Sequence, residues 1–344
     1  MKAVCFFNNK GGVGKTTLIC NIASYFGLEF GLRVLIVDAD PQCNSTQLIL
    51  DPSLVENLYD SNSGDSNLVT LNTVLEPILV GDSSIDIKPI SQFQYNKKFG
   101  ITLLPGHPRL ALLEDKLSSS WRDFKGGDAG GARITNWTTQ FLRKIDTEFD
   151  YVFFDVGPSL GAINRSILIG ADYVVVPMGC DIFSLIGVDN ISSWLDDWKQ
   201  GYADALVSTL RNHKELTTTF PVLDSVSSSS RVAGYTVQQY ITKTIKGERR
   251  PTDAYDRIIQ EIPQRLESKL GKYFAPGIDK ANMHLGDVPH MFSLVPLAQN
   301  AHVPIHKLTS GDGLAGGQRS QLEQYRQFIQ TMCDRLRSNL QLSR

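Results

Sequence analysis

A glycine-rich segment near the start of the chain constrains the possible folds more than any other feature of the sequence. Residues 10–17 read Lys-Gly-Gly-Val-Gly-Lys-Thr-Thr, between an apolar run at residues 3–7 and a helical pattern at residues 18–28. Glycines let backbone N–H groups converge on phosphate oxygens, and a helix N-terminus adds partial positive charge at the same point. The order of strand, glycine turn and helix therefore predicts a phosphate-binding loop in an α/β fold.

The side chains of this loop indicate how phosphates and a metal ion are held. Lys15 supplies a mobile positive charge, and the hydroxyl of Thr16 is the natural Mg²⁺ ligand. A nucleotide and Mg²⁺ are therefore the expected cofactors. The residues expected to bind the nucleotide phosphates are Gly11, Gly12, Val13, Gly14, Lys15, Thr16 and Thr17.

The loop departs from the common phosphate-loop motif at two positions. Asn9 stands where that motif has its first glycine, and a second lysine, Lys10, precedes the glycines. In both respects the segment resembles the deviant Walker A loop of the ParA/MinD family of ATPases. The resemblance implies that Lys10 reaches across to the nucleotide of a partner subunit. It also implies a homodimer that encloses two ATP molecules between its subunits.

Two apolar runs end in carboxylates. Residues 34–37 lead into Asp38 and Asp40, and residues 151–154 lead into Asp155. Carboxylates that follow parallel strands point into the crevice where α/β sheets bind ligands. The family resemblance gives Asp40 the role of orienting or activating the attacking water. It places Asp38 at the water shell of the magnesium ion and Asp155, the Walker B carboxylate, near Mg²⁺ through water.

Strand-like and helical patterns alternate along the chain, which predicts a doubly wound, mostly parallel sheet with helices on both faces. We expect one domain over residues 1–344, with insertions near 57–100 and 201–230. The glycine-rich residues 126–131 predict a break before a helix at 134–149. A last strand is expected at 292–297. Its continuation resembles the family segment that encloses the adenine, which implies a base near Pro296 and Leu297.

The composition limits where the chain acts and what it binds. The net charge of −2 gives no global signature for nucleic acid, and the five cysteines form no CxxC pair. This cysteine usage favours a reducing compartment, so we expect a cytoplasmic protein. Lys243, Lys246, Arg249 and Arg250 form the densest basic cluster. The cluster fits either nonspecific contacts to DNA phosphates, which are common in related proteins, or a solvated turn.

The last segment of the chain is amphipathic. It carries apolar residues from Leu322 to Leu340 on one face, with Glu323 and Asp334 among the polar residues. Such a segment could be a terminal membrane-targeting helix or a helix docked on the sheet. Its length and its acidic residues favour docking, so we do not expect stable membrane binding.

Three functions fit these features. The first is a slow Mg-ATP-dependent, dimerising switch of the ParA type that positions DNA or other cargo, binds DNA nonspecifically with ATP and is stimulated by a protein partner. The second is an ATP-switched regulator that binds a protein partner and uses no DNA. The third is a small-molecule synthetase on the same fold. Lys10 together with the segment 38–42 disfavours the synthetase, because such enzymes generally lack this pair.

Overall fold

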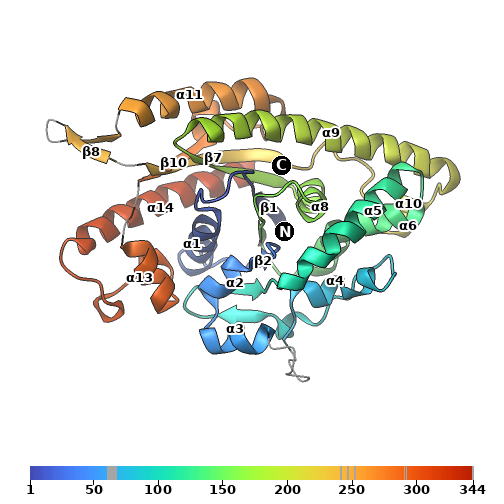
Figure 1. The fold of residues 1–344 in the computed structure, drawn as a ribbon, viewed down its shortest axis with the longest axis horizontal. Coiled ribbons are helices and arrows are strands. Elements are labelled where there is room, and N and C mark those ends of the chain that lie inside the picture. Colours follow the sequence, from blue (N-terminus) through green and yellow to red (C-terminus); the bar gives the residue numbers. More distant parts are fainter. Residues whose placement is uncertain are drawn as a thin grey trace.

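The architecture is taken from a computed structural model of the chain. It describes residues 1–59, 68–240, 242–245, 248–251, 253–289, 291 and 293–342. Within these ranges, helices cover both faces of a central sheet (Figure 1). The predicted fold class is confirmed. The division into one domain with two insertions stays a prediction.

The sheet has eight strands in the order β10-β7-β6-β1-β5-β2-β4-β3. Its pairs are parallel except for the antiparallel pair of β3 with β4. The central strands β1, β2 and β5 are short and almost entirely buried, as expected for strands covered on both faces. A separate hairpin joins β8 and β9. The strands are β1 Lys2–Phe6, β2 Val34–Asp38, β3 Gln94–Asn96, β4 Ile101–Leu104, β5 Tyr151–Asp155, β6 Tyr173–Gly179, β7 Arg231–Tyr240, β8 Thr242–Ile245, β9 Glu248–Pro251 and β10 His284–Pro289.

Fourteen α-helices are present in the described ranges, and those that pack on the sheet cover it on two sides (Figure 1). They are α1 Lys15–Leu28, α2 Asn44–Ile49, α3 Pro52–Tyr59, α4 Leu71–Leu79, α5 Leu113–Lys125, α6 Ala129–Thr135, α7 Trp137–Ile145, α8 Ala162–Gly170, α9 Ile182–Asn212, α10 Leu216–Thr219, α11 Asp253–Leu270, α12 Lys280–Met283, α13 Leu294–Ala301 and α14 Gln318–Leu342.

Alternation along the strands divides the core between the two faces. Cys5 and Val37 pack with side chains of α4, α5, α7, α8, α9 and α11, whereas Phe6 and Ile36 pack with α1, α13 and α14. Successive side chains of a strand point to opposite faces, so each inner strand contributes to both layers. The carboxyl ends of β1, β2 and β5 are thereby held at one edge of the sheet.

Two local predictions differ from the structure. The break predicted at 126–131 is confined to 126–128, because α5 ends at Lys125 and α6 already begins at Ala129, where the Asp128 side chain caps it by accepting a 2.6 Å hydrogen bond from Gly131 N. The strand expected at 292–297 is absent at the described positions, since Leu294 begins the helix α13. In both places a capped or packed helix prevailed over a weak local pattern.

The amphipathic C-terminal segment forms α14, and its apolar face packs on the sheet. Leu322, Ile329 and Leu336 are fully buried in the core layer that also contains α1. The prediction of a docked helix is therefore confirmed. Within the described parts of the chain, every helix is too short or too polar to cross a bilayer.

A third apolar cluster lies at the far end of α9. Trp121 and Phe124 of α5 pack there against Tyr202 and Leu206 of α9. Helix α9 extends to Asn212, and its second half builds a lobe with α5, α6 and α10 (Figure 1). Helix α5 connects this lobe to the central sheet.

The contact between α1 and β4 generates a stability prediction. A methyl group at Gly27 would lie 2.1 Å from the carbonyl oxygen of Gly100. We expect Gly27→Ala to lower the free energy of unfolding by about 1–3 kcal/mol in urea denaturation, because backbone must shift to make room. Gly317→Ala is the control, since its methyl group would meet nothing within 4 Å. Equal stability of the two variants would contradict the close packing described here.

Candidate nucleotide-binding site

The glycine-rich loop joins β1 to α1 at the carboxyl edge of the sheet. Gly12 and Gly14 have φ values of 75° and 74°, in the left-handed region that favours glycine. The buried Asn8 side chain fixes the start of the loop: its amide donates to Pro177 O at 2.7 Å and its oxygen accepts from Lys10 N at 3.0 Å. The loop is therefore shaped before any ligand binds.

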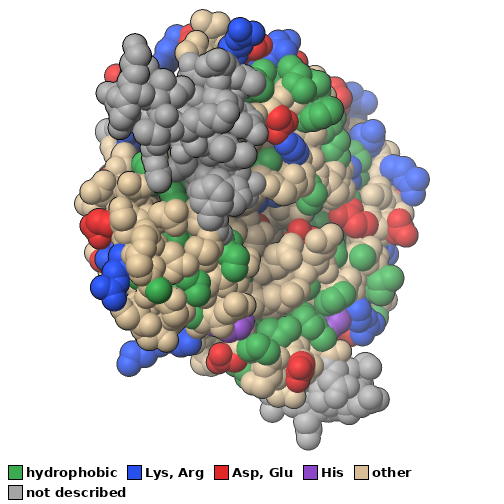
Figure 2. Space-filling model, turned by 60° about the vertical axis from the view of Figure 1, so that its left-hand side comes forward, with side chains coloured by type: hydrophobic (Ala, Val, Ile, Leu, Met, Phe, Trp, Pro, Cys, Tyr) green, Lys and Arg blue, Asp and Glu red, His purple; other side chains and the backbone are tan. Residues whose placement is uncertain are grey.

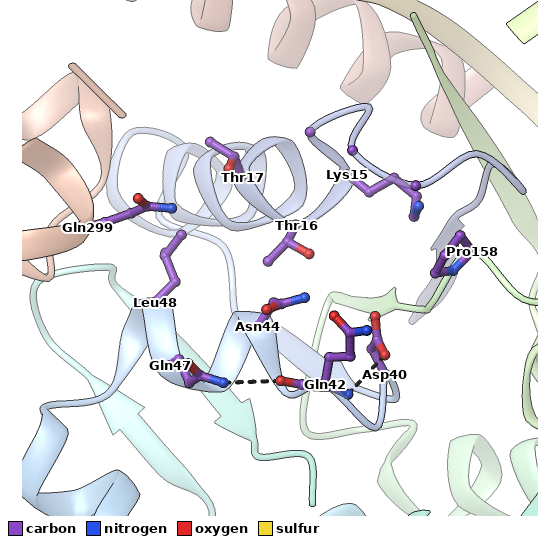
Figure 3. Close-up of a pocket in the computed structure, with 13 residues that line it drawn as sticks. Lys15, Thr16, Thr17, Asp40, Gln42, Asn44, Gln47, Leu48, Pro158 and Gln299 are labelled. Carbon is purple, nitrogen blue, oxygen red and sulfur yellow. Dashed lines mark hydrogen bonds between the residues drawn. The ribbon is translucent and has the colours of Figure 1, made fainter. Parts of the chain in front are cut away.

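A cavity of about 560 Å³ opens over this loop. Lys15 and Asp40 lie at one end of it, and Leu48 and Gln299 lie at the other (Figure 3). The space-filling view shows a face of the molecule that is hollowed near its centre (Figure 2). The lining consists of Gly11, Gly12, Gly14, Lys15, Thr16, Thr17, Asp40, Gln42, Asn44, Gln47, Leu48, Pro158 and Gln299.

Asp40 and Lys15 bring opposite charges to the phosphate end of the cavity. The Asp40 carboxylate accepts a 3.0 Å hydrogen bond from Gln42 N, which fixes its orientation at the cavity wall (Figure 3). Lys15 Nζ donates to Lys10 O at 3.2 Å. Burial lowers the pKa of Lys15, and the carboxylates of Asp155 and Asp40 oppose that shift. Both charged groups therefore lie where they could contact a polar ligand in this cavity.

Asp38 and Asp155 lie side by side behind the loop, because β2 and β5 pair in parallel with these two residues in register. Both carboxylates are buried. Asp38 accepts hydrogen bonds from Thr46 N at 2.8 Å and Thr46 Oγ1 at 2.7 Å. Asp155 Oδ2 accepts one from Ser45 Oγ at 2.5 Å. The first turn of α2 thus supplies donors to both carboxylates.

Burial changes the ionisation of this pair. It raises the pKa of Asp155 to about 6, against which the hydrogen bond from Ser45 acts. Burial also raises the pKa of Asp38 to about 8, and the neighbouring charge of Asp155 adds to that shift. Two neighbouring buried carboxylates do not readily ionise together unless a positive charge lies close to both. The pair therefore favours a cation nearby.

The donor set fits a magnesium ion. Asp155 Oδ1 is buried, and the Thr16 side chain, which lines the adjacent cavity, lies close enough to lower the pKa of Asp155. These are hard oxygen ligands of the kind that Mg²⁺ shares with phosphates and water. The described residues hold no group of three or more His, Cys, Asp and Glu side chains suited to a metal. A bound ion would thus depend on the nucleotide phosphates as well.

Lys10 is not among the residues that line the cavity. Its ammonium group pairs with the Asp181 carboxylate, and both side chains are about one-third exposed. Asp181 also caps α9, with Oδ1 accepting from Phe183 N at 2.9 Å and Ser184 N at 3.1 Å. Sequence reasoning missed this pairing, because the two residues are distant in the chain.

The base end of the cavity differs from the expected one. Pro296 is exposed on α13, and neither it nor Leu297 lines the cavity, whereas Gln299 of the same helix does. Leu48 and Gln47 of α2 lie opposite Gln299 (Figure 3). The position of the adenine stays a prediction. Nothing in the local sequence singled out these residues, because the cavity joins two segments that are distant in the chain.

The fold and this loop define a P-loop nucleotide-binding protein. A family model described as an AAA domain (AAA_31) matches residues 1–207, more than half of the chain. The chain belongs to this family and is a ParA/MinD-type P-loop ATPase.

Proteins similar to this chain include a partition protein and two proteins of known structure. The chromosome partitioning protein ParA of Myxococcus xanthus is 28% identical over 201 residues, which cover 58% of this chain and 60% of that protein. The crystal structure of protein DIP2308 from Corynebacterium diphtheriae is 33% identical, with a TM-score of 0.72, and the match covers 88% of this chain and 97% of the other. An McdA variant from Cyanothece in complex with ATP shares the fold, with a TM-score of 0.60 at 14% identity over 100% of this chain and 98% of that one.

The raised pKa of Asp155 predicts how stability depends on pH. Its folded-state pKa of about 6 exceeds the ordinary 3.8, so the folded protein loses stability as pH rises through this window. Asp155→Asn removes the buried charge. At pH 8 without nucleotide we expect the free energy of unfolding of the variant to exceed that of the wild type by about 1–3 kcal/mol. At pH 5 we expect a smaller difference between the two proteins.

The measurement is chemical denaturation at both pH values, with the exposed Asp82→Asn as control. The stabilisation that Mg-ATP gives the wild type should shrink in Asp155→Asn, because the negative charge that faces the magnesium ion is lost. If the free energy of unfolding of the variant, relative to that of the wild type, is lower at pH 8 than at pH 5, the buried charge of Asp155 does not destabilise the fold.

Proposed function

We propose that the chain is a slow Mg²⁺-dependent ATPase switch that closes as a homodimer on ATP. The observation that carries the proposal is the cavity in which Lys15, Thr16 and the loop glycines face Asp40. Charges and N–H groups on one wall and a carboxylate on the other suit a triphosphate and an attacking water. The membership in the ParA/MinD-type ATPases supports the same reading.

Hydrolysis would use the residues in separate roles. Lys15 and the N–H groups of the loop would stabilise the charge that develops on the transferred phosphoryl group. Asp40 would accept a hydrogen bond from a water molecule and align it for in-line attack on the γ-phosphorus, opposite the departing ADP oxygen. When bound, magnesium would neutralise phosphate charge near Thr16 and Asp155, with Asp38 at its water shell.

The dimer part of the proposal is supported by the surface next to Lys10. The first turns of α9 present three large exposed apolar side chains, Ile182, Phe183 and Ile186. Clustered exposed apolar side chains commonly mark protein interfaces. They adjoin Asp181, which holds Lys10 within one chain. In a closed dimer, Lys10 would exchange Asp181 for a phosphate of the facing subunit.

Two kinds of cargo remain compatible with such a switch. The similarity to a chromosome partitioning protein favours DNA, and the backbone of the β8–β9 hairpin pairs Lys243 with Arg250 and Thr244 with Arg249. Lys246 lies outside the described residues. On the coloured part of the visible face, lysines and arginines are spread around the outline (Figure 2). A stimulating protein partner, with or without DNA, is therefore the second candidate.

Two substitutions separate ATP binding from hydrolysis. We expect Asp40→Ala to keep ATP affinity within about threefold while turnover falls by about 10²-fold or more, because the water loses its positioning group. Lys15→Ala should abolish binding. Equilibrium binding and phosphate release provide the readouts. Normal turnover in Asp40→Ala would remove the role assigned to that carboxylate.

The apolar surface of α9 gives a second test. Phe183→Asp, in the Asp40→Ala background with ATP and Mg²⁺, should leave a monomer in light scattering, because it buries a charge in the proposed interface. Val207→Asp is a matched control: it adds the same charge at the other end of α9, where Val207 is 59% exposed and Phe183 is 67% exposed. A dimer that survives Phe183→Asp would show that this surface is not the interface.

A further inference from the structure

The N-terminus of α8 is held by a carboxylate from a different helix. Gly161, the residue before α8, has no side chain with which to cap it. Instead, the carboxylate of Glu114 in the first turn of α5 accepts hydrogen bonds from Ala162 N and, at 3.4 Å, from Ile163 N. A carboxylate at this position satisfies unpaired N–H groups and interacts favourably with the helix dipole. Glu114 therefore anchors the start of α8.

Gly161 leaves the room that this anchor needs. A methyl group there would lie 2.3 Å from Oε1 of Glu114. The φ of Gly161 is −66°, which alanine adopts without strain. Glycine is thus needed at this position because it has no side chain, and not because the backbone adopts a special conformation. Gly161→Ala should displace Glu114 without changing its charge.

The anchored helix in turn holds the loop that follows β5. The buried side chain of Asn164, in the first turn of α8, donates to Gly157 O at 2.8 Å and to Ser159 O at 2.7 Å. The connection from Val156 to Leu160 is therefore fixed from within α8. Any displacement of the first turn of α8 would move this loop.

The same loop contacts the candidate catalytic groups. A methyl group on Gly157 would lie 3.2 Å from Oδ1 of Asp40, so the loop backbone packs against that carboxylate. Pro158 lines the nucleotide cavity and faces Gly11 of the phosphate loop (Figure 3). The contacts thus run without interruption from Glu114 through α8 and Asn164 to Asp40.

We propose that Glu114 is a positioning residue for ATP hydrolysis: it anchors α8 and thereby fixes the loop 156–160 against Asp40 and the phosphate cradle. The inference rests on the proposed ATPase function for its catalytic consequence. The anchor itself is a property of the nucleotide-free chain. Glu114 also lies on α5, whose other end packs in the lobe around Trp121 and Phe124.

The test compares Glu114→Gln with Gly161→Ala. Glutamine keeps the size of the side chain but lacks the charge, and its one carbonyl oxygen cannot occupy both positions from which Oε1 and Oε2 accept. Hydrogen exchange of the nucleotide-free protein should be roughly tenfold faster for peptide 156–163 in both variants. In both, kcat for ATP should fall by about 10- to 100-fold, while the dissociation constant of ATP changes by less than about threefold.

Asp115→Asn is the control, because it removes a carboxylate from the neighbouring, exposed position on α5 and should leave both readouts at wild-type values. Faster exchange with unchanged kcat would overturn the positioning role, and unchanged exchange would overturn the anchor. A wild-type chain without ATPase activity would instead overturn the proposed function. Accelerated exchange in the two variants would still establish the anchor in that case.

Discussion

The adjacent burial of Asp38 and Asp155 is the constraint on which the rest of the site depends. Parallel pairing of β2 with β5 puts the two carboxylates in register inside the protein. Buried charges are costly unless hydrogen bonds and opposite charges compensate them. Thr46 and Ser45 in the first turn of α2 supply donors, and Lys15 at the start of α1 supplies positive charge. Helices α1 and α2 therefore start where their donors and charge can compensate the two buried carboxylates. The cavity lies between these two helices.

The same strand end produces two carboxylates with different surroundings. Asp38 is the last residue of β2 and points into the protein, whereas Asp40, two residues on, lies beyond the strand at the cavity wall. Thr46 donates two hydrogen bonds to the Asp38 carboxylate, so the position of Asp38 is fixed by the fold. Asp40 is held through the backbone of its own turn, and its carboxylate faces a space where a ligand fits. One segment thus provides both a charge that organises the site and a charge that can act on a water molecule.

The sequence predicted the parts of this arrangement that depend on contiguous residues. The loop at 10–17, the buried strands before Asp38 and Asp155 and the docked C-terminal helix each have a pattern within one segment. The missed features depend on contacts between distant segments: Glu114 meets Ala162 across 48 positions, and Gln299 reaches the cavity only because α13 packs near α2. The helix at 129–135 was missed for a related reason, since Asp128 and the packing on α5 stabilise glycines that are unfavourable in isolation.

The Lys10–Asp181 pair bears on how easily the proposed switch could move. The two carboxylate oxygens of Asp181 have different partners: Oδ1 caps α9, and Oδ2 pairs with Lys10. Lys10 can therefore leave without uncapping the helix. A pair exposed to this degree contributes at most about 1 kcal/mol, so a phosphate of a facing subunit is a competitive partner for the lysine. The anchored loop 156–160 would stay in place during that exchange, because Glu114 and Asn164 hold it independently of Lys10. Closure would thus require one side chain to change partners while the groups that orient the water remain fixed.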